Sequence, residues 1–169
     1  KMTWNDKLKT QIPQYWQSGT LSAYGMILSG GTPFTGNLNF YAEEGIAWIT
    51  PNDLSNNTSN MFISHGERDI SLQGLHSRSA TLIPPESILL STRAPIGYIA
   101  ISMNELTTNQ GFKTLVPNNT DNTCFLYYLL KRNIPYLEQM GTGTTFKEVS
   151  KDSMEHLLVI LPPDNILTQ

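Results

Sequence analysis

Side chains suited to recognising nucleic acid bases stand close together near the middle of the chain. Asn109 and Gln110 are adjacent amides, and Arg93 precedes the turn-forming residues Ala94-Pro95-Ile96-Gly97. An amide offers a hydrogen-bond donor and an acceptor together, which suits adenine, whereas a guanidinium suits guanine or a phosphate. The residue types therefore indicate recognition of bases or phosphates at two turns.

Further arginines lie in the polar stretch His65–Ser79. Arg68 stands between two acidic residues, so a solvated ion pair is favoured slightly over a DNA contact there. Arg78 stands between two serines with no adjacent acid, a small polar setting that suits a phosphate or a base edge. Both arginines are therefore candidates for DNA binding, each with a structural alternative.

Two loops rich in glycine and threonine offer other contacts. Ser29-Gly30-Gly31-Thr32-Pro33 lacks the Gly-Lys-Ser/Thr of a nucleotide-binding loop, and Gly141-Thr142-Gly143-Thr144-Thr145 is followed by Phe146-Lys147. Backbone N–H groups, hydroxyls and lysines commonly contact DNA phosphates, although plain connectors would look the same. The candidates from these loops are Gly31, Thr32, Thr142, Thr144 and Lys147.

Residues that build common catalytic centres are missing from the sequence. No lysine has an acidic residue two positions before it, and the Pro-Pro pairs are followed by acids rather than by the aromatic residue of an adenine methyltransferase loop. The three histidines lack metal-ligand spacing, and one cysteine cannot build a zinc cluster. Nucleotide-cofactor and serine-hydrolase fingerprints are absent too. We therefore expect a protein that is not an enzyme and holds no cofactor or metal.

Three antiparallel strands are predicted around the two turns, arranged as a meander. They are Ile88–Leu90, Tyr98–Ser102 and Phe112–Val116. Trp48 and Cys124 are expected in the core, since aromatic residues and free cysteines are commonly buried. The fold class that follows is α+β, with a twisted, mainly antiparallel sheet and a few short helices.

Other elements are predicted from apolar runs, turn residues and helix caps. Strands are predicted at Thr20–Leu28, Ile46–Ile49 and Leu157–Leu161, an irregular arm at Trp4–Trp16 and an exposed loop at Asn52–Asn60. A buried helix should start at Asp121–Thr123 and end at Lys131-Arg132, before Pro135. A second helix is predicted at Ser150–His156, with Ser150 as its cap.

Composition supports one globular domain with an acidic surplus. The chain has 169 residues, of which 39% are apolar, and its formal charge is -3 from 11 Lys and Arg against 14 Asp and Glu. A DNA-binding protein of this charge needs a local basic face. No apolar run is long enough to span a bilayer and the N-terminus is not signal-like, so we expect a cytoplasmic protein.

The order of several motifs resembles the target recognition domain of type I restriction–modification specificity (S) subunits. The motifs are Gly30-Gly31-Thr32-Pro33, Ile46-Ala47-Trp48-Ile49-Thr50, Ser91-Thr92-Arg93-Ala94-Pro95-Ile96-Gly97, Thr108-Asn109-Gln110-Gly111-Phe112, Gly141-Thr142-Gly143-Thr144-Thr145 and Leu161-Pro162-Pro163. The resemblance implies that residues 1–161 form a non-catalytic domain reading half of a split double-stranded DNA target. Residues 162–169 would start a truncated spacer helix.

The resemblance also implies partners. Methyltransferase (M) subunits would methylate adenine with S-adenosylmethionine, and a restriction (R) subunit would cut DNA, so S-adenosylmethionine, Mg and ATP would belong to those partners. A second recognition domain or a homodimer through the C-terminal helix stays open. Family members read different sequences, so Asn109 and Gln110 are expected to brace a turn. Arg93 would contact phosphate or pin its turn. Base reading would fall to Asn52–Asn60, His65–Ser79 and Phe34–Gly45.

Two other functions are compatible with the residues. The acidic charge, the aromatic residues and the Asn/Thr-rich loops also fit a carbohydrate-binding β module. The truncated C-terminal helix fits an assembly domain that does not bind DNA. The ordered motifs and the missing catalytic residues favour the DNA reader over both.

Overall fold

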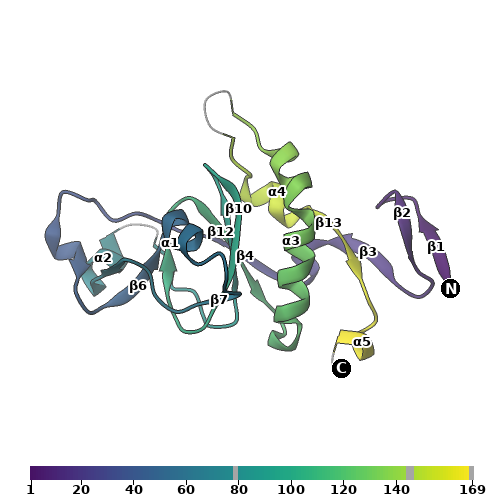
Figure 1. Ribbon diagram of the computed structural model, residues 1–169, viewed down its shortest axis with the longest axis horizontal. Helices are drawn as coiled ribbons and strands as arrows, with labels where there is room; N and C mark the ends of the chain where they lie inside the picture. Colours follow the sequence, from purple (N-terminus) through teal and green to yellow (C-terminus); the bar gives the residue numbers. More distant parts are fainter. Residues whose placement is uncertain (78–79, 144–146, 168–169) are drawn as a thin grey trace.

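The computed structural model describes residues 1–77, 80–143 and 147–167. Figure 1 shows an elongated molecule with a large sheet in the middle. The hairpin of β1 (Met2–Asn5) and β2 (Thr10–Pro13) lies at one end, and a lobe with β6 (Ile46–Ile49) and α2 (Leu72–Ser77) lies at the other. The expected α+β class is confirmed. Among the described residues, no helix is long and apolar enough to cross a membrane.

The central sheet has five strands. In spatial order they are β4 (Gly25–Ser29), β12 (Phe112–Pro117), β9 (Ile88–Thr92), β10 (Ile96–Ser102) and β7 (Phe62–Ile63). Neighbours are antiparallel except β10 and β7. Every residue of β9 is buried, which suits a strand with partners on both sides.

The predicted meander is therefore wrong, although its three strands form. β12 pairs with β9 and not with β10, because the chain between β10 and β12 first forms a strand of a second sheet. Thr107–Thr108 forms the short strand β11 of that sheet, parallel to β6. The remaining strands of the second sheet are β8 (Arg68–Ile70) and β5 (Tyr41–Ala42).

A hydrophobic cluster joins the two sheets. It contains Ala47 and Ile49 of β6, Leu89 of β9, and the fully buried Phe112 at the start of β12. Because these side chains come from both sheets, neither sheet can move without exposing them. The small lobe is thereby tied to the central sheet.

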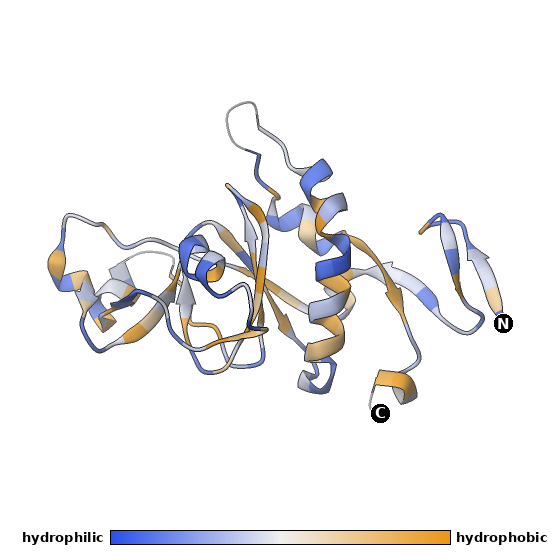
Figure 2. Ribbon diagram, in the orientation of Figure 1, coloured by the Kyte–Doolittle hydropathy of each residue, from blue (hydrophilic) through white to orange (hydrophobic). Residues whose placement is uncertain are grey.

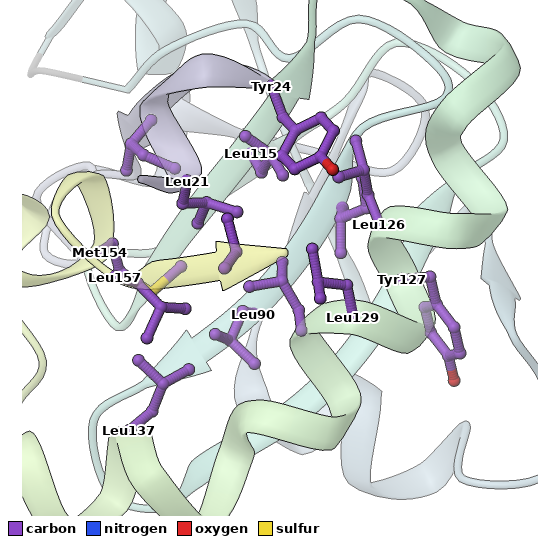
Figure 3. Packing of buried hydrophobic residues seen from close by; sticks show 14 of the residues in the cluster. Leu21, Tyr24, Leu90, Leu115, Leu126, Tyr127, Leu129, Leu137, Met154 and Leu157 are labelled. Carbon is purple, nitrogen blue, oxygen red and sulfur yellow. The ribbon is translucent and has the colours of Figure 1, made fainter. Parts of the chain in front are cut away.

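The opposite face of the central sheet is covered by helix α3 (Thr123–Met140) and helix α4 (Lys151–Glu155) (Figures 1 and 3). Helix α3 continues past Pro135, where the sequence predicted its end, because Leu137 beyond the proline is fully buried in this cluster. Figure 2 shows hydrophobic and hydrophilic bands along α3, as expected for a helix buried on one face. Cys124 lies on the exposed face, so its predicted place in the core is wrong.

Helix α1 (Pro51–Asn56) occupies most of the predicted exposed loop. The Oδ2 atom of Asp53 accepts a hydrogen bond from Thr50 N–H at 2.7 Å, and the Thr50 hydroxyl accepts one from Asp53 N–H at 3.4 Å. This reciprocal cap satisfies free N–H groups, and proline suits the first helical position. Leu54 adds a buried anchor, so a polar run forms a helix.

The N-terminus lies at the end of the molecule that the β1–β2 hairpin forms, and the C-terminus lies on the same side of α3 as this hairpin (Figure 1). The expected irregular arm contains the β1–β2 hairpin, and the predicted strand Thr20–Leu28 is split by a 3-10 turn. Strand β3 (Gln17–Thr20) pairs with β13 (Leu158–Leu161). The predictions of β6, of β13 and of Ser150 as the cap of α4 are confirmed. Helix α5 (Asp164–Leu167) lies where a helix was expected to begin.

Replacing Leu137 with alanine tests whether the end of α3 is part of the core. We expect Leu137→Ala to lower the free energy of unfolding by about 2–5 kcal/mol, because it leaves a cavity under the helix. Tyr136→Ala, at an exposed neighbouring position, should change it by about 0.5 kcal/mol. Denaturant titration measures both. Equal effects would show that the helix does not pack beyond Pro135.

Candidate nucleic-acid interface

One end of the central sheet collects most of the polar segments singled out above. Strand β4 ends and β12 begins at this end, since Ser29 lies opposite Lys113. Strand β9 ends there too, since Ser91 lies opposite Phe112. The chain segments that follow or precede these residues therefore leave the sheet side by side.

Backbone hydrogen bonds join these segments into one row. The N–H of Gly31 donates to the carbonyl of Thr108 at 2.9 Å, and the N–H of Thr92 donates to Gly111 at 2.8 Å. The N–H of Val149 donates to Thr92 at 3.0 Å. We call this row, formed by residues 30–33, 91–95, 107–113, 141–143 and 147–149, the strand-end edge.

Three of the predicted contacts meet at one part of the strand-end edge. Arg93 and Thr142 both form isolated β-bridges with Glu148, next to Lys147 in the chain. Arg93 and Lys147 are exposed, and among the described residues neither forms an ion pair. Lys113 is buried beneath them, and its Nζ lies 3.4 Å from Glu148 Oε1.

The strand-end edge is basic although the chain is acidic. In sequence it contains the three cations Arg93, Lys113 and Lys147 and one acid, Glu148, against a formal charge of -3 for the whole chain. Since the ion pair uses Lys113 to neutralise Glu148, the exposed arginine and lysine remain for an external anion. The strand-end edge therefore carries two exposed cations without an ion-pair partner among the described residues.

The two amides of the strand-end edge stabilise loops. Asn109 Oδ1 accepts a hydrogen bond from Gly111 N–H at 2.9 Å, so the prediction that Asn109 braces its turn is confirmed. Gln110 Oε1 accepts a hydrogen bond from the hydroxyl of Thr32 in the neighbouring loop. Both amide oxygens are therefore used within the protein.

Two aromatic residues hold the loop Gly30–Pro33 in place through hydrogen bonds to its carbonyl groups. Trp48, buried as predicted, donates its Nε1–H to Gly31 O at 3.0 Å, and the Tyr41 hydroxyl donates to Pro33 O at 3.0 Å. Any side chain at Gly30 would overlap the backbone of Asn109, so only glycine fits there.

These bonds change the role expected for Gly31. Its N–H is bonded to Thr108 and its carbonyl to Trp48, so it has no backbone donor left for a phosphate. The backbone N–H of Gly31 therefore gives no support to the predicted phosphate contact. The N–H of Thr32 forms no hydrogen bond within the described residues, so it is a free donor of the loop.

Arg68 behaves differently from its sequence expectation. Successive side chains of a strand point to opposite faces, so Arg68 and Asp69 of β8 diverge. In the described part of the chain Arg68 forms no ion pair, and its guanidinium carbon lies 5.9 Å from the centre of the Tyr41 ring. The favoured ion pair with its sequence neighbours is therefore wrong.

Tyr41 was missed by the sequence analysis, since no local pattern distinguishes it from other tyrosines. Burial raises the pKa of its hydroxyl above 10.0, and the positive charge of Arg68 opposes that shift. The phenol therefore stays protonated near neutral pH and can donate its hydrogen bond to Pro33.

Two predicted contacts, Arg78 and Thr144, lie outside the described residues. Within the described residues no group of histidine, cysteine and acidic side chains could hold a metal ion.

A profile of the family described as "Type I restriction modification DNA specificity domain" matches residues 13–169. The type I restriction enzyme MjaIX specificity subunit of Methanocaldococcus jannaschii is 36% identical over 168 residues, covering 96% of this chain and 38% of that protein. The HindI specificity subunit of Haemophilus influenzae is 27% identical over 159 residues, covering 92% and 34%. This chain thus spans well under half the length of these relatives.

A solved structure has the same fold. The crystal structure of the HsdS subunit from Thermoanaerobacter tengcongensis superposes with a TM-score of 0.68 at 21% identity. The match covers 92% of this chain and 35% of that one. At this identity the likeness concerns the fold alone.

Replacing Trp48 with phenylalanine tests the anchoring of the loop Gly30–Pro33. Trp48→Phe keeps a buried ring but removes the donor to Gly31, so the free energy of unfolding should fall by about 1–3 kcal/mol. Amide exchange in the loop should also accelerate. Trp4→Phe, at an exposed position, is the matched control and should change neither quantity. Unchanged exchange in Trp48→Phe would refute the anchor.

Proposed function

The chain belongs to the type I restriction modification DNA specificity domain family, and from that premise we propose that it reads the base sequence of double-stranded DNA. The observation that carries this proposal is the strand-end edge, which is basic in a net-acidic chain. It includes the Gly30–Pro33 and Thr108–Phe112 motifs, residues 91–95, and the segment that carries Thr142 and Lys147. Family membership favours this function over a carbohydrate-binding module or an assembly domain.

Phosphate contacts are assigned to the exposed groups of the strand-end edge. Arg93 and Lys147 supply charge, Thr142 supplies a hydroxyl, and Thr32 supplies its free N–H. Such contacts set the register of a protein on the duplex but carry no sequence information. Arg78 and Thr144 stay predicted contacts of the same kind.

The bracing groups act indirectly. Asn109 holds the turn that carries Gln110, and Gln110 holds Thr32. The N–H of Gly31 bonds the loop to Thr108, just before that turn. These residues position the phosphate contacts, so they can be common to proteins that read different DNA sequences.

The partners of the intact subunit follow from the proposed role. As part of a specificity subunit, this non-catalytic chain would direct an M subunit carrying S-adenosylmethionine to adenine, and an R subunit using Mg and ATP to cleave DNA. A second recognition domain or a homodimer would supply the other half of the target. DNA as the substrate implies that the chain works in the cytoplasm.

Neutralising the strand-end edge should weaken DNA binding equally for all sequences. Each of Arg93→Ala and Lys147→Ala removes one phosphate contact, so the slope of log K against log salt should fall by about 0.9. Fluorescence anisotropy with a mixed-sequence duplex measures this, using the full subunit with its methyltransferase partner.

Arg132→Ala is the matched control, because Arg132 is an exposed arginine on α3, outside the strand-end edge. It should leave both the affinity and the salt slope unchanged. If Arg132→Ala weakened binding as much as Arg93→Ala, the strand-end edge would not be the DNA-binding face. An intact subunit whose DNA binding did not respond to salt would overturn the proposed function.

A further inference from the structure

We propose that Arg68 reads a guanine in the DNA target and thereby requires a G·C pair at one position. The inference rests on the proposed function, because it names what one side chain recognises within the duplex. It is carried by three observations: the guanidinium is exposed and has no ion-pair partner in the described part of the chain, it lies over an aromatic ring, and its surroundings repel phosphate.

Two of the acids near Arg68, Asp69 and Asp53, make contacts elsewhere. Asp69 is 4% exposed, its Oδ2 accepts a hydrogen bond from Gly45 N–H at 2.8 Å, and its Oδ1 lies 3.4 Å from His65 Nε2. Asp53 accepts from Thr50 N–H through one oxygen and from Glu67 N–H, at 2.8 Å, through the other. Neither carboxylate is free to neutralise the guanidinium.

The guanidinium is held in place before any DNA arrives. It lies over the Tyr41 ring, and a cation in this position is attracted to the face of the ring. The ring is fixed by the hydrogen bond to Pro33 and by an edge contact with Trp48, whose ring centre is 6.0 Å away. A side chain already ordered loses less entropy on binding, which favours affinity.

The surroundings of Arg68 separate a base contact from a phosphate contact. Residues 34–79 contain five acids, Glu43, Glu44, Asp53, Glu67 and Asp69, and two arginines. Arg68 also lines an open hollow of about 570 Å³ together with Glu43 and Glu67. Such a surface repels the phosphate backbone, so a lone arginine here is a poor phosphate anchor.

Guanine is the base that matches this side chain. In the major groove guanine presents two acceptors, O6 and N7, at a spacing that a guanidinium can contact with two parallel hydrogen bonds. The other three bases do not present that pair. Because Tyr41 fixes Arg68 beside the loop Gly30–Pro33, the base reader and the phosphate contacts are linked through one anchor.

A selection from randomised duplexes tests the proposal, using the full subunit with its methyltransferase partner. Wild-type protein should select a site that includes an invariant guanine. Arg68→Ala should accept all four bases at that position, with a loss of preference of about 5- to 150-fold, and should keep its other preferences. If the alanine variant folds poorly, Arg68→Gln replaces it; this variant should also lose the requirement for guanine, and its amide would favour adenine at that position.

Arg93→Ala is the contrast, since it should lower affinity for every duplex without changing the selected sequence. If Arg68→Ala behaved like Arg93→Ala, Arg68 would be a phosphate contact and the inference would be overturned while the proposed function stood. An unchanged affinity and sequence would overturn it as well. Failure of the wild-type protein to select any sequence would instead overturn the proposed function.

Discussion

The structure depends on the path of the chain between β10 and β12. Instead of turning back directly, this segment pairs Thr107–Thr108 with β6 and only then returns to the central sheet. This pairing links the small lobe to the central sheet through backbone hydrogen bonds. Leu106 and Phe112, on either side of the segment, are buried in the hydrophobic cluster between the two sheets. The same path of the chain also delivers Asn109 and Gln110 to the end of the sheet where the other polar loops emerge.

Charge is divided between the two parts of the molecule. The strand-end edge has a surplus of cations, whereas residues 34–79 have a surplus of acids. A duplex lying on such a surface would be attracted at the edge and excluded from close backbone contact at the lobe. Affinity and base reading can therefore reside on different elements, which lets one change without the other.

Several sequence predictions were wrong because local signals competed with packing. Pro135 normally ends a helix, but the buried Leu137 beyond it keeps α3 intact. The polar composition after Thr50 predicts a loop, but the reciprocal cap of Thr50 and Asp53 favours a helix. These two residues and Pro51 could have indicated the helix from the sequence. The apolar surroundings of Cys124 in the chain did not reveal which face of α3 it occupies.

The sequence by itself determined the class of fold, the main strands of the central sheet and most of the residues gathered at the strand-end edge. Motifs and alternation carry that information, because they act between close neighbours in the chain. Only the tertiary structure decided which donors stay free. The N–H and the carbonyl of Gly31 form hydrogen bonds with Thr108 and Trp48. Arg68 forms no ion pair with Asp69, because the carboxylate of Asp69 lies on the other face of the strand and accepts a hydrogen bond from Gly45. These outcomes depend on pairing between distant strands, which no local pattern encodes.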